Sequence, residues 1–396
     1  MSAPGPDPAT TRPPSEGGWF RFGAELSRPD GQFDPPSSDV AIWNPIPPFR
    51  PDVPPVDTGT YPPAGYAVVP ATARTPLPHL ARQRLPETAV EYPQLLRGPT
   101  RAWWRPILTL PLFVLLFGVL SILPVLVSLA YGTISGQRDL GVTLDQLSDD
   151  SAISEPAAYL YLNLTLIALI PAAMLSIWAV HRIRPRFLSS VAGGLRWRWL
   201  LRCLAALAPL WAVYLIISTV IEPPQSARPE HWITLLVMGL LLTPWQAAAE
   251  EYAFRGWLTQ NIGAYFARPL VAVVVPAIVA AAAFAAAHGS PDPLVLADLA
   301  AFSLTASFLT WRTGGLEAAI VLHTVNNVGI GIIGNAVGGF AESFVGADTE
   351  STLISLGVSL LMYASAIALV LWQARQAGVE RWFRPPLSAA PSLPPQ

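Results

Sequence analysis

Long apolar stretches, each close to the length of a membrane-spanning helix, follow one another through most of this 396-residue chain. About 20 consecutive apolar residues are enough for a helix to cross the hydrocarbon core of a bilayer. Eight stretches after Arg105 approach that length. They cover approximately residues 107–131, 157–180, 200–220, 232–254, 270–288, 294–311, 316–338 and 352–372. The pattern predicts an all-α fold, a polytopic membrane helix bundle with about eight transmembrane helices.

The first 98 residues have a different amino-acid composition. They contain roughly half of the chain's 42 prolines and no periodic apolar run. Proline removes backbone donors, and a segment that cannot bury apolar surface stays disordered. We therefore expect a disordered Pro-rich tail over residues 1–98, a helical domain over 99–384 and a short disordered tail over 385–396. Four aromatic residues are candidate docking points for an unknown protein, and a plain solvated tail is the alternative: Trp19, Phe20, Phe22 and Trp43.

Composition agrees with a membrane protein and excludes several kinds of chemistry. Hydrophobic residues make up 52% of the chain and charged residues only 13%, with a mean hydropathy of +0.43. The net charge of −2 gives nucleic-acid binding no electrostatic basis. No lysine is present, which excludes lysine nucleophiles. A single cysteine, Cys203, excludes a disulfide within the chain.

Arginines mark alternate loops between the apolar segments. They cluster before the first segment, between the second and third, and after the eighth. The loop at 132–156 instead carries five acidic residues and one arginine, and the loop at 340–351 carries acidic residues and no arginine. Positively charged loops stay on the cytoplasmic side. We therefore expect a multi-pass protein of the cell membrane, embedded in lipid, with both termini in the cytoplasm.

Two adjacent carboxylates, Glu250 and Glu251, close the fourth apolar segment, and Arg255 follows. A charged side chain within the bilayer costs about 2.5–3.5 kcal/mol on insertion scales. Residues four apart share a helix face, so Glu251 and Arg255 are predicted to form an ion pair, while Glu250 points about 100° away toward a cavity. Adjacent carboxylates favour a general base that takes a proton from water. The alternative is an interfacial helix end where these charges meet water.

Two of the chain's five histidines fall within apolar segments. His288 ends the fifth segment in a Phe-x-x-x-His pattern, and His323 lies in the seventh with Asn327 four residues later. His323 and Asn327 therefore share a helix face. Because the fifth segment is predicted to run outward, His288 should lie deeper than Glu250. That conflict requires either a tilted or kinked helix or a misplaced boundary.

The ordered set Glu-Glu-x-x-x-Arg, Phe-x-x-x-His and His-x-x-x-Asn resembles the CPBP intramembrane protease family, also called the CAAX prenyl protease type II, Abi or bacteriocin-processing family. The resemblance covers roughly residues 195–345, and the remaining helices fit the family's eight-span core. It implies an intramembrane endopeptidase that acts on a membrane-bound, in some cases lipidated, protein or peptide. Within such a site, Glu251 and Arg255 would shape and brace the catalytic groups.

The resemblance also implies roles for the other four motif residues. Glu250 would activate the attacking water, and His288 would orient the water or the substrate. His323 and Asn327 would polarise the scissile carbonyl and stabilise the oxyanion.

The motifs leave the metal and the function open to alternatives. If a metal is present, Glu250, His288 and His323 are its expected ligands, and Zn²⁺ is the candidate cofactor. A mechanism without metal is equally consistent, because asparagine is a poor zinc ligand and the His-Glu-x-x-His zinc helix is absent. A non-catalytic membrane scaffold or immunity protein of the same fold is the main alternative function. A transporter is disfavoured because no inverted repeat is evident.

Overall fold

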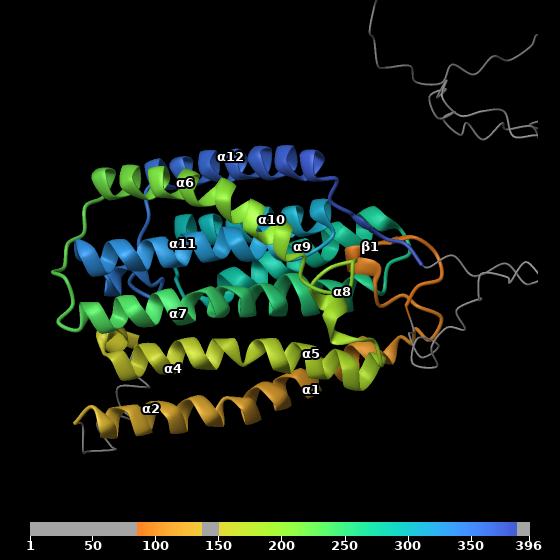
Figure 1. Ribbon diagram of the computed structural model, residues 1–396, viewed down its shortest axis with the longest axis horizontal. Helices are drawn as coiled ribbons and strands as arrows, with labels where there is room; N and C mark the ends of the chain where they lie inside the picture. The colour runs from red at the N-terminus through yellow and green to blue at the C-terminus, as the bar shows by residue number, and fades with distance from the viewer. Residues whose placement is uncertain (1–84, 137–149, 386–396) are drawn as a thin grey trace, which may run out of the picture. The chain divides into compact units, whose positions relative to one another are not determined.

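The computed structural model describes residues 85–136 and 150–385, and the predictions for residues 1–84 and 386–396 lie outside these ranges. Among the described residues, eight helical spans are long and apolar enough to cross a membrane. The predicted all-α, multi-pass helix bundle is therefore confirmed (Figure 1).

The helices and strands follow one another with short connections. In chain order they are β1 (Val90–Glu91), η1 (Tyr92–Gln94), α1 (Trp104–Leu120), α2 (Ile122–Ile134), η2 (Asp150–Ser154), α4 (Pro156–Ile167), α5 (Leu169–His181), η3 (Pro185–Leu188), α6 (Trp197–Ile221), α7 (Trp232–Glu251), η4 (Tyr252–Leu258), α8 (Thr259–Gly263), α9 (Pro269–Ala287), α10 (Pro293–Thr313), α11 (Glu317–Ala336), η5 (Ala341–Ser343), α12 (Leu353–Ala377) and β2 (Trp382–Phe383). Of these, η4 is a π-helix and the other η elements are 3₁₀-helices.

Local sequence explains where several helices begin and end. Pro156, Pro269 and Pro293 occupy the first helical positions of α4, α9 and α10, where the missing N–H of proline costs nothing. Asp292 caps α10 by accepting from the backbone N–H groups of Leu294 and Val295. At its other end, α10 stops at a glycine in the left-handed conformation.

The fourth span is longer than the sequence indicated. We expected it to end at residue 254, and that boundary was wrong. The helical backbone continues through η4 and α8, so that the span covers Trp232–Gly263. Arg255 resembles a helix end in the sequence, but its charge is paired with Glu251 inside the protein. The two carboxylates therefore lie within the fourth helical span and not at its end.

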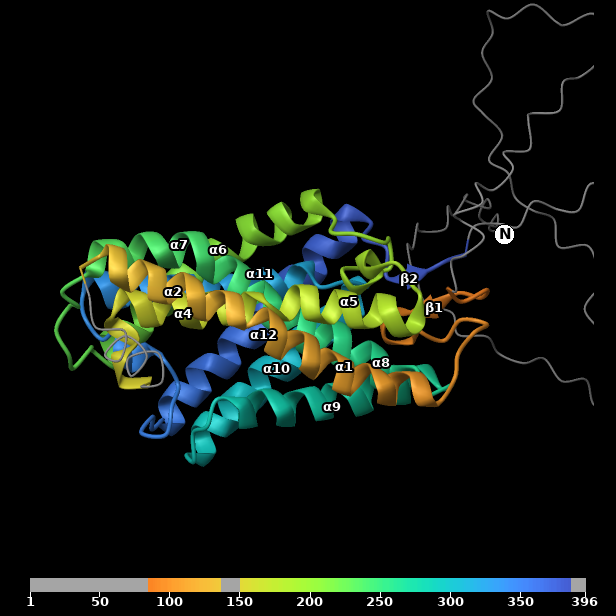
Figure 2. The same cartoon turned by 90° about the horizontal axis from the view of Figure 1, so that it is seen from below.

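Helix α7 occupies a central position in the bundle. It packs against α4 on one side and α11 on the other, and α11 in turn contacts α6 and α10 (Figures 1 and 2). Helix α10 lies between α9 and α12, while α1 packs against α5. This order brings together the three segments that carry the sequence motifs, namely the end of α7, the end of α9 and the first half of α11.

The beginning and the end of the described chain meet at one end of the bundle. β1 and β2 pair antiparallel, with Val90 opposite Phe383 and Glu91 opposite Trp382 (Figure 2). The carboxylate of Glu91 accepts from Arg381 and from the indole of Trp311. The two ends of the described chain meet because an even number of spans returns the chain to its starting side. That this side is the cytoplasm remains a prediction.

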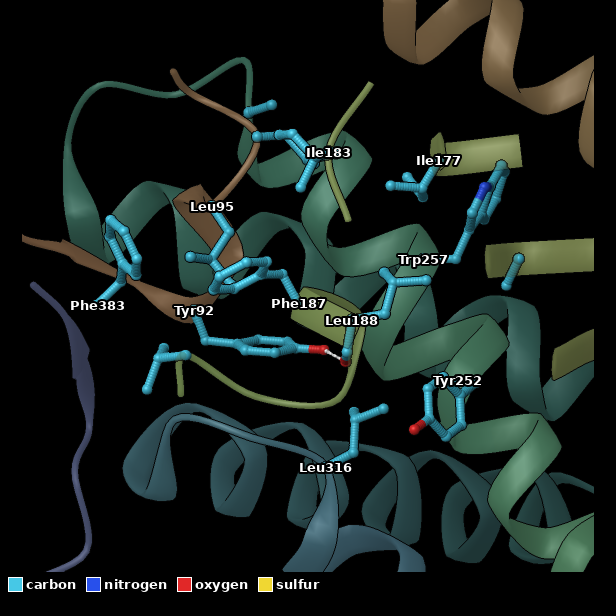
Figure 3. Packing of buried hydrophobic residues seen from close by; sticks show 14 of the residues in the cluster. Tyr92, Leu95, Ile177, Ile183, Phe187, Leu188, Tyr252, Trp257, Leu316 and Phe383 are labelled. Atoms are coloured by element: carbon cyan, nitrogen blue, oxygen red, sulfur yellow. Dashed lines mark hydrogen bonds between the residues drawn. The ribbon is translucent and has the colours of Figure 1, made fainter. Parts of the chain in front are cut away.

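Residues 85–97, here called the N-terminal plug, are folded onto this end of the bundle. Tyr92 and Leu95 are fully buried among α5, η3, η4 and β2 residues, and the Tyr92 hydroxyl donates to the carbonyl of Leu188 (Figure 3). Gln94 donates to the carbonyls of Phe266 and Ala267 over 3.0 and 3.1 Å. The predicted boundary of the disordered tail at residue 98 was therefore too late. Proline content indicated disorder, but the apolar side chains of this short segment are buried by other elements.

The plug approaches α8 so closely that only glycine fits at one contact. A Cβ atom on Gly263 would lie 2.3 Å from the carbonyl oxygen of Pro93. We predict that Gly263→Ala displaces the N-terminal plug and lowers the free energy of unfolding by about 1–3 kcal/mol, as overpacking does. Amide hydrogen exchange of residues 85–97 should accelerate. Gly357→Ala is the control, since nothing lies within 4 Å of its added Cβ; equal protection in both variants would contradict the prediction.

Candidate active site

The site begins where α7 passes into the π-helical segment η4. Glu250 and Glu251 are the last residues of α7, and Arg255 lies within η4. π-Helical turns are rare, and they are frequently found at functional sites. Here the turn joins the acid-bearing helix to the arginine without ending the span.

One carboxylate oxygen of Glu251 accepts hydrogen bonds from two side chains. Its Oε1 atom lies 2.9 Å from Nη1 of Arg255 and 2.8 Å from Nδ1 of His323. A carboxylate can only accept, so Nδ1 of His323 carries the proton in this contact. Glu251 and Arg255 are fully buried, and His323 is 3% exposed. The predicted ion pair is present, and it also orients the histidine.

Aromatic rings surround the arginine. The guanidinium carbon of Arg255 lies 4.5 Å from the ring centroid of Phe284 and 5.9 Å from those of Phe254 and Phe302. Cations are attracted to aromatic faces, most strongly when desolvated. The rings of Phe284 and Phe302 also contact His323 edge-on, at 5.9 and 5.1 Å between centroids. Aromatic rings therefore enclose Arg255 and His323 on several sides.

Glu250 lies on the other side of His323. Its Oε2 atom is 3.9 Å from Nε2 of His323, and its Oε1 accepts from the side-chain amide of Gln246. At 8% exposure it is slightly more accessible than Glu251. The two carboxylates thus differ in their partners, since Arg255 and His323 bind Oε1 of Glu251, whereas Glu250 faces Nε2 of the histidine.

Side-chain amides of α7 and α11 form a hydrogen-bonded chain that begins at Glu250. Gln246 accepts from the side-chain amide of Asn327 over 3.3 Å, and Asn327 accepts from Asn326 over 3.1 Å. Trp211 on α6 donates to Asn326 over 3.1 Å. The side chain of Gln246 therefore links Asn327 to Glu250. Hydrogen bonds fix the orientation of the Gln246 and Asn327 amides.

His288 lies beside this group without bonding to it. It caps α9, and its Nδ1 atom is 2.8 Å from the carbonyl oxygen of Phe284 in its own last turn. Its ring is 4.7 Å from that of Phe284, which in turn contacts His323. Among the described contacts, none joins His288 to Glu250 or Glu251 by a hydrogen bond or an ion pair. The ring of Phe284 thus contacts both His288 and His323.

The expected conflict of depth between His288 and Glu250 arose from the misplaced boundary of the fourth span. Since that span continues to Gly263, Glu250 lies roughly 20 Å before its end at the usual rise of 1.5 Å per residue. The end of α9 can then lie near the site without an unusual tilt.

The residues anticipated as zinc ligands do not fit a metal in this arrangement. In the part of the chain that the structure describes, no three His, Cys, Asp or Glu side chains are grouped as a metal would require. Among the described contacts, no hydrogen bond or ion pair joins His288 to Glu250 or His323, and Nδ1 of His323 is engaged by Glu251.

Gln246, Trp211 and Phe302 are parts of the site that the motifs did not indicate. Gln246 precedes Glu250 by one helical turn, and a glutamine within an apolar helix needs a partner, so its position was a usable signal. Trp211 and Phe302 gave no such signal, because both resemble ordinary apolar helix residues. Only packing between distant helices places them here.

Comparison with known proteins finds a match in the part of the chain that carries these residues. Residues 231–329 match the family model of type II CAAX prenyl endopeptidase Rce1-like proteins. The uncharacterized protein YyaK of Bacillus subtilis (strain 168) is 26% identical over 187 residues, which cover 46% of this chain and 62% of YyaK. No solved structure matches.

The matched segment runs from the start of α7 into the middle of α11, so it contains all six of the predicted site residues. The predicted resemblance is thereby confirmed for this part of the chain, and the family suggests intramembrane protease activity. Over residues 231–329, this multi-pass membrane protein is therefore similar to the type II CAAX prenyl endopeptidase Rce1-like proteins.

Proposed function

We propose that this protein is an intramembrane endopeptidase in which Glu250 activates a water molecule to hydrolyse a peptide bond. The substrate class is a membrane-associated protein or peptide, with lipidated chains among the candidates. One observation carries the proposal: Glu250 and His323 face each other at 3.9 Å, while the second nitrogen of His323 is fixed by Glu251.

The distance between Glu250 and His323 suits a water held by both. At 3.9 Å, Oε2 and Nε2 are too far apart for a direct hydrogen bond, and a water can bridge such a gap. Glu250 takes a proton from this water as the oxygen attacks the scissile carbonyl carbon. The proton then passes from Glu250 to the departing amine as the C–N bond breaks. No net charge or electron is left on the protein.

Asn327 is the proposed donor to the oxyanion of the tetrahedral intermediate, while His323 orients the water. One N–H of the Asn327 amide donates to Gln246 and the other is available for an oxyanion. Donors that are already oriented are worth several kcal/mol in such sites, because nothing has to reorganise during the reaction. His288 is proposed to contact the substrate from the end of α9, one ring away from the water.

Glu251 and Arg255 are proposed to position the reacting groups. Glu251 fixes the orientation of His323, in the way that a third group orients the base in catalytic triads. Arg255 pairs with Glu251 within the bundle. Burial of these charges costs free energy. A scaffold protein of the same fold would have no use for them.

Hydrolysis can be tested directly with a peptide library in proteoliposomes prepared in ¹⁸O-labelled water. We expect new C-terminal carboxylates that each carry one ¹⁸O atom, found by mass spectrometry of the products. Empty liposomes are the control. A library that stays intact through substrates of varied lipidation would instead favour the scaffold or the transporter.

Gln246 is predicted to matter for rate and little for substrate affinity. Gln246→Leu removes the amide that holds both Glu250 and Asn327. Misplacement of catalytic groups by about 1 Å can cost on the order of 10²-fold, so kcat should fall about 10–10²-fold with KM nearly unchanged. Steady-state kinetics on the cleaved peptide measure this, with the exposed Gln225→Leu as control. A change confined to KM would show that Gln246 binds the substrate instead.

Metal removal is predicted to leave cleavage unchanged. The ligand set expected from the sequence is not assembled, and the proposed steps use only side chains. Rates before and after chelation, together with metal analysis of the purified protein, check this. Loss of activity that returns with Zn²⁺ would overturn it.

A further inference from the structure

Helix α10 carries a row of buried hydroxyl groups that the proposed reaction does not use. Ser303, Ser307 and Thr310 are spaced by four and three residues, so they lie on one face of the helix. All three are buried, and their hydroxyl oxygens have no hydrogen-bond partner within the described part of the chain. Hydroxyls in membrane helices commonly bond to their own backbone, as Thr313 does at the end of this helix. The row is therefore unusual.

Arg255 faces the same region with unused donors. Its Nη1 atom is bonded to Glu251, whereas Nε and Nη2 have no partner among the described residues. A small cavity is lined by Arg255, Ser307 and Thr310 and also by Tyr92, Pro93 and Trp311. The cavity thus lies between the arginine of the site and the N-terminal plug.

We propose that this cavity is a buried hydration site, in which ordered water bridges Arg255 to the hydroxyls of Ser307 and Thr310. Buried polar groups in folded proteins are almost always hydrogen-bonded, and water supplies the missing bonds where space is polar and large enough. Water accepts from Nε and Nη2 and also exchanges hydrogen bonds with the hydroxyls. The side chains of the plug residues Tyr92 and Pro93 close the cavity toward the end of the bundle.

Charge favours water over an anion at this position. The charge of Arg255 is already balanced by Glu251 at 2.9 Å, and Glu250 adds a further carboxylate nearby. An anion would meet a net negative surrounding, and the cavity is too small for a larger organic ligand. The hydration site does not depend on the peptidase assignment, because it follows from unpaired groups and space alone.

The sign of the change in Tm, when a hydroxyl group is removed, distinguishes a cavity that contains water from an empty one. Thr310→Val removes the hydroxyl at constant shape, so it should lower the Tm if the hydroxyl is bonded to water and raise it if the hydroxyl is unpaired. We expect a lowered Tm for Thr310→Val and Ser307→Ala. Ser128→Ala is the control, since Ser128 is a buried hydroxyl without a described partner that does not line the cavity; its Tm should stay constant or rise. A rise in the two cavity variants would overturn the proposal.

X-ray radiolytic labelling of the wild-type protein in nanodiscs gives a second test that needs no variant. Bound water generates hydroxyl radicals in place and oxidises the side chains around it. Tyr92 is fully buried, yet it should be labelled several-fold faster than Tyr159, which is 4% exposed and does not line the cavity. Labelling of Tyr92 at or below the rate of Tyr159 would refute the hydration site, whatever the protease assays show.

Discussion

Glu250→Gln is expected to reduce peptide hydrolysis by about 10²–10⁴-fold, the usual contribution of a positioned general base. Glutamine has nearly the same shape, and its carbonyl can still accept from Gln246 as the carboxylate does. It cannot take a proton from water. The fold should therefore survive, with a Tm close to that of the wild type, while kcat falls.

Kinetics and thermal unfolding of the same preparation measure both effects. Glu87→Gln, which changes an exposed carboxylate in the N-terminal plug, is the matched control and should retain full activity. Equal rates for Glu250→Gln and Glu87→Gln would remove Glu250 from the reaction. Collapse of the fold in Glu250→Gln would instead show that the carboxylate is needed for stability.

Arg255→Met is expected to cause the largest loss of stability in the chain. Arg255 and Glu251 are both fully buried, so removal of the cation leaves an uncompensated carboxylate within the bundle. Breaking a buried ion pair in this way costs about 3–5 kcal/mol. The guanidinium also fills the space among three phenylalanine rings. Methionine replaces only part of that packing.

A double-mutant cycle separates charge from packing. The variant Glu251→Gln with Arg255→Met removes both charges, and it should recover part of the lost free energy of unfolding measured in mixed detergent micelles. Arg268→Met, at an exposed arginine before α9, is the control and should change stability by less than about 1 kcal/mol. A double variant no more stable than Arg255→Met alone would show that packing, not charge, sets the cost.

The spans were predictable because apolar length is a strong signal, but their ends were not. All eight predicted segments correspond to helical spans. The fourth extends to Gly263 because Glu251 neutralises Arg255, and an ion pair formed inside the bundle cannot be distinguished in sequence from a helix end at the membrane surface. The N-terminal plug was missed for a related reason. Its proline content is that of a disordered chain, and only contact with α5, η3 and η4 buries it.

Residues of the site were predictable where a pair lies on one helix. The Glu251–Arg255 contact follows from four-residue spacing, and His323 and Asn327 both lie in the assembled group. The distance of His288 from the carboxylates was not predictable, because it depends on where α9 ends relative to α7. Trp211 likewise reaches the site only through the packing of α6 on α11.

The most direct measurement is a comparison of membrane-protein termini in cells that carry the wild-type protein or Glu250→Gln. New chain termini, and an uncut precursor that accumulates only with the variant, are predicted if Glu250 activates the hydrolytic water in its native membrane. Identical sets of termini, with both proteins present at equal abundance, would contradict the assignment of a protease centred on Glu250 and His323.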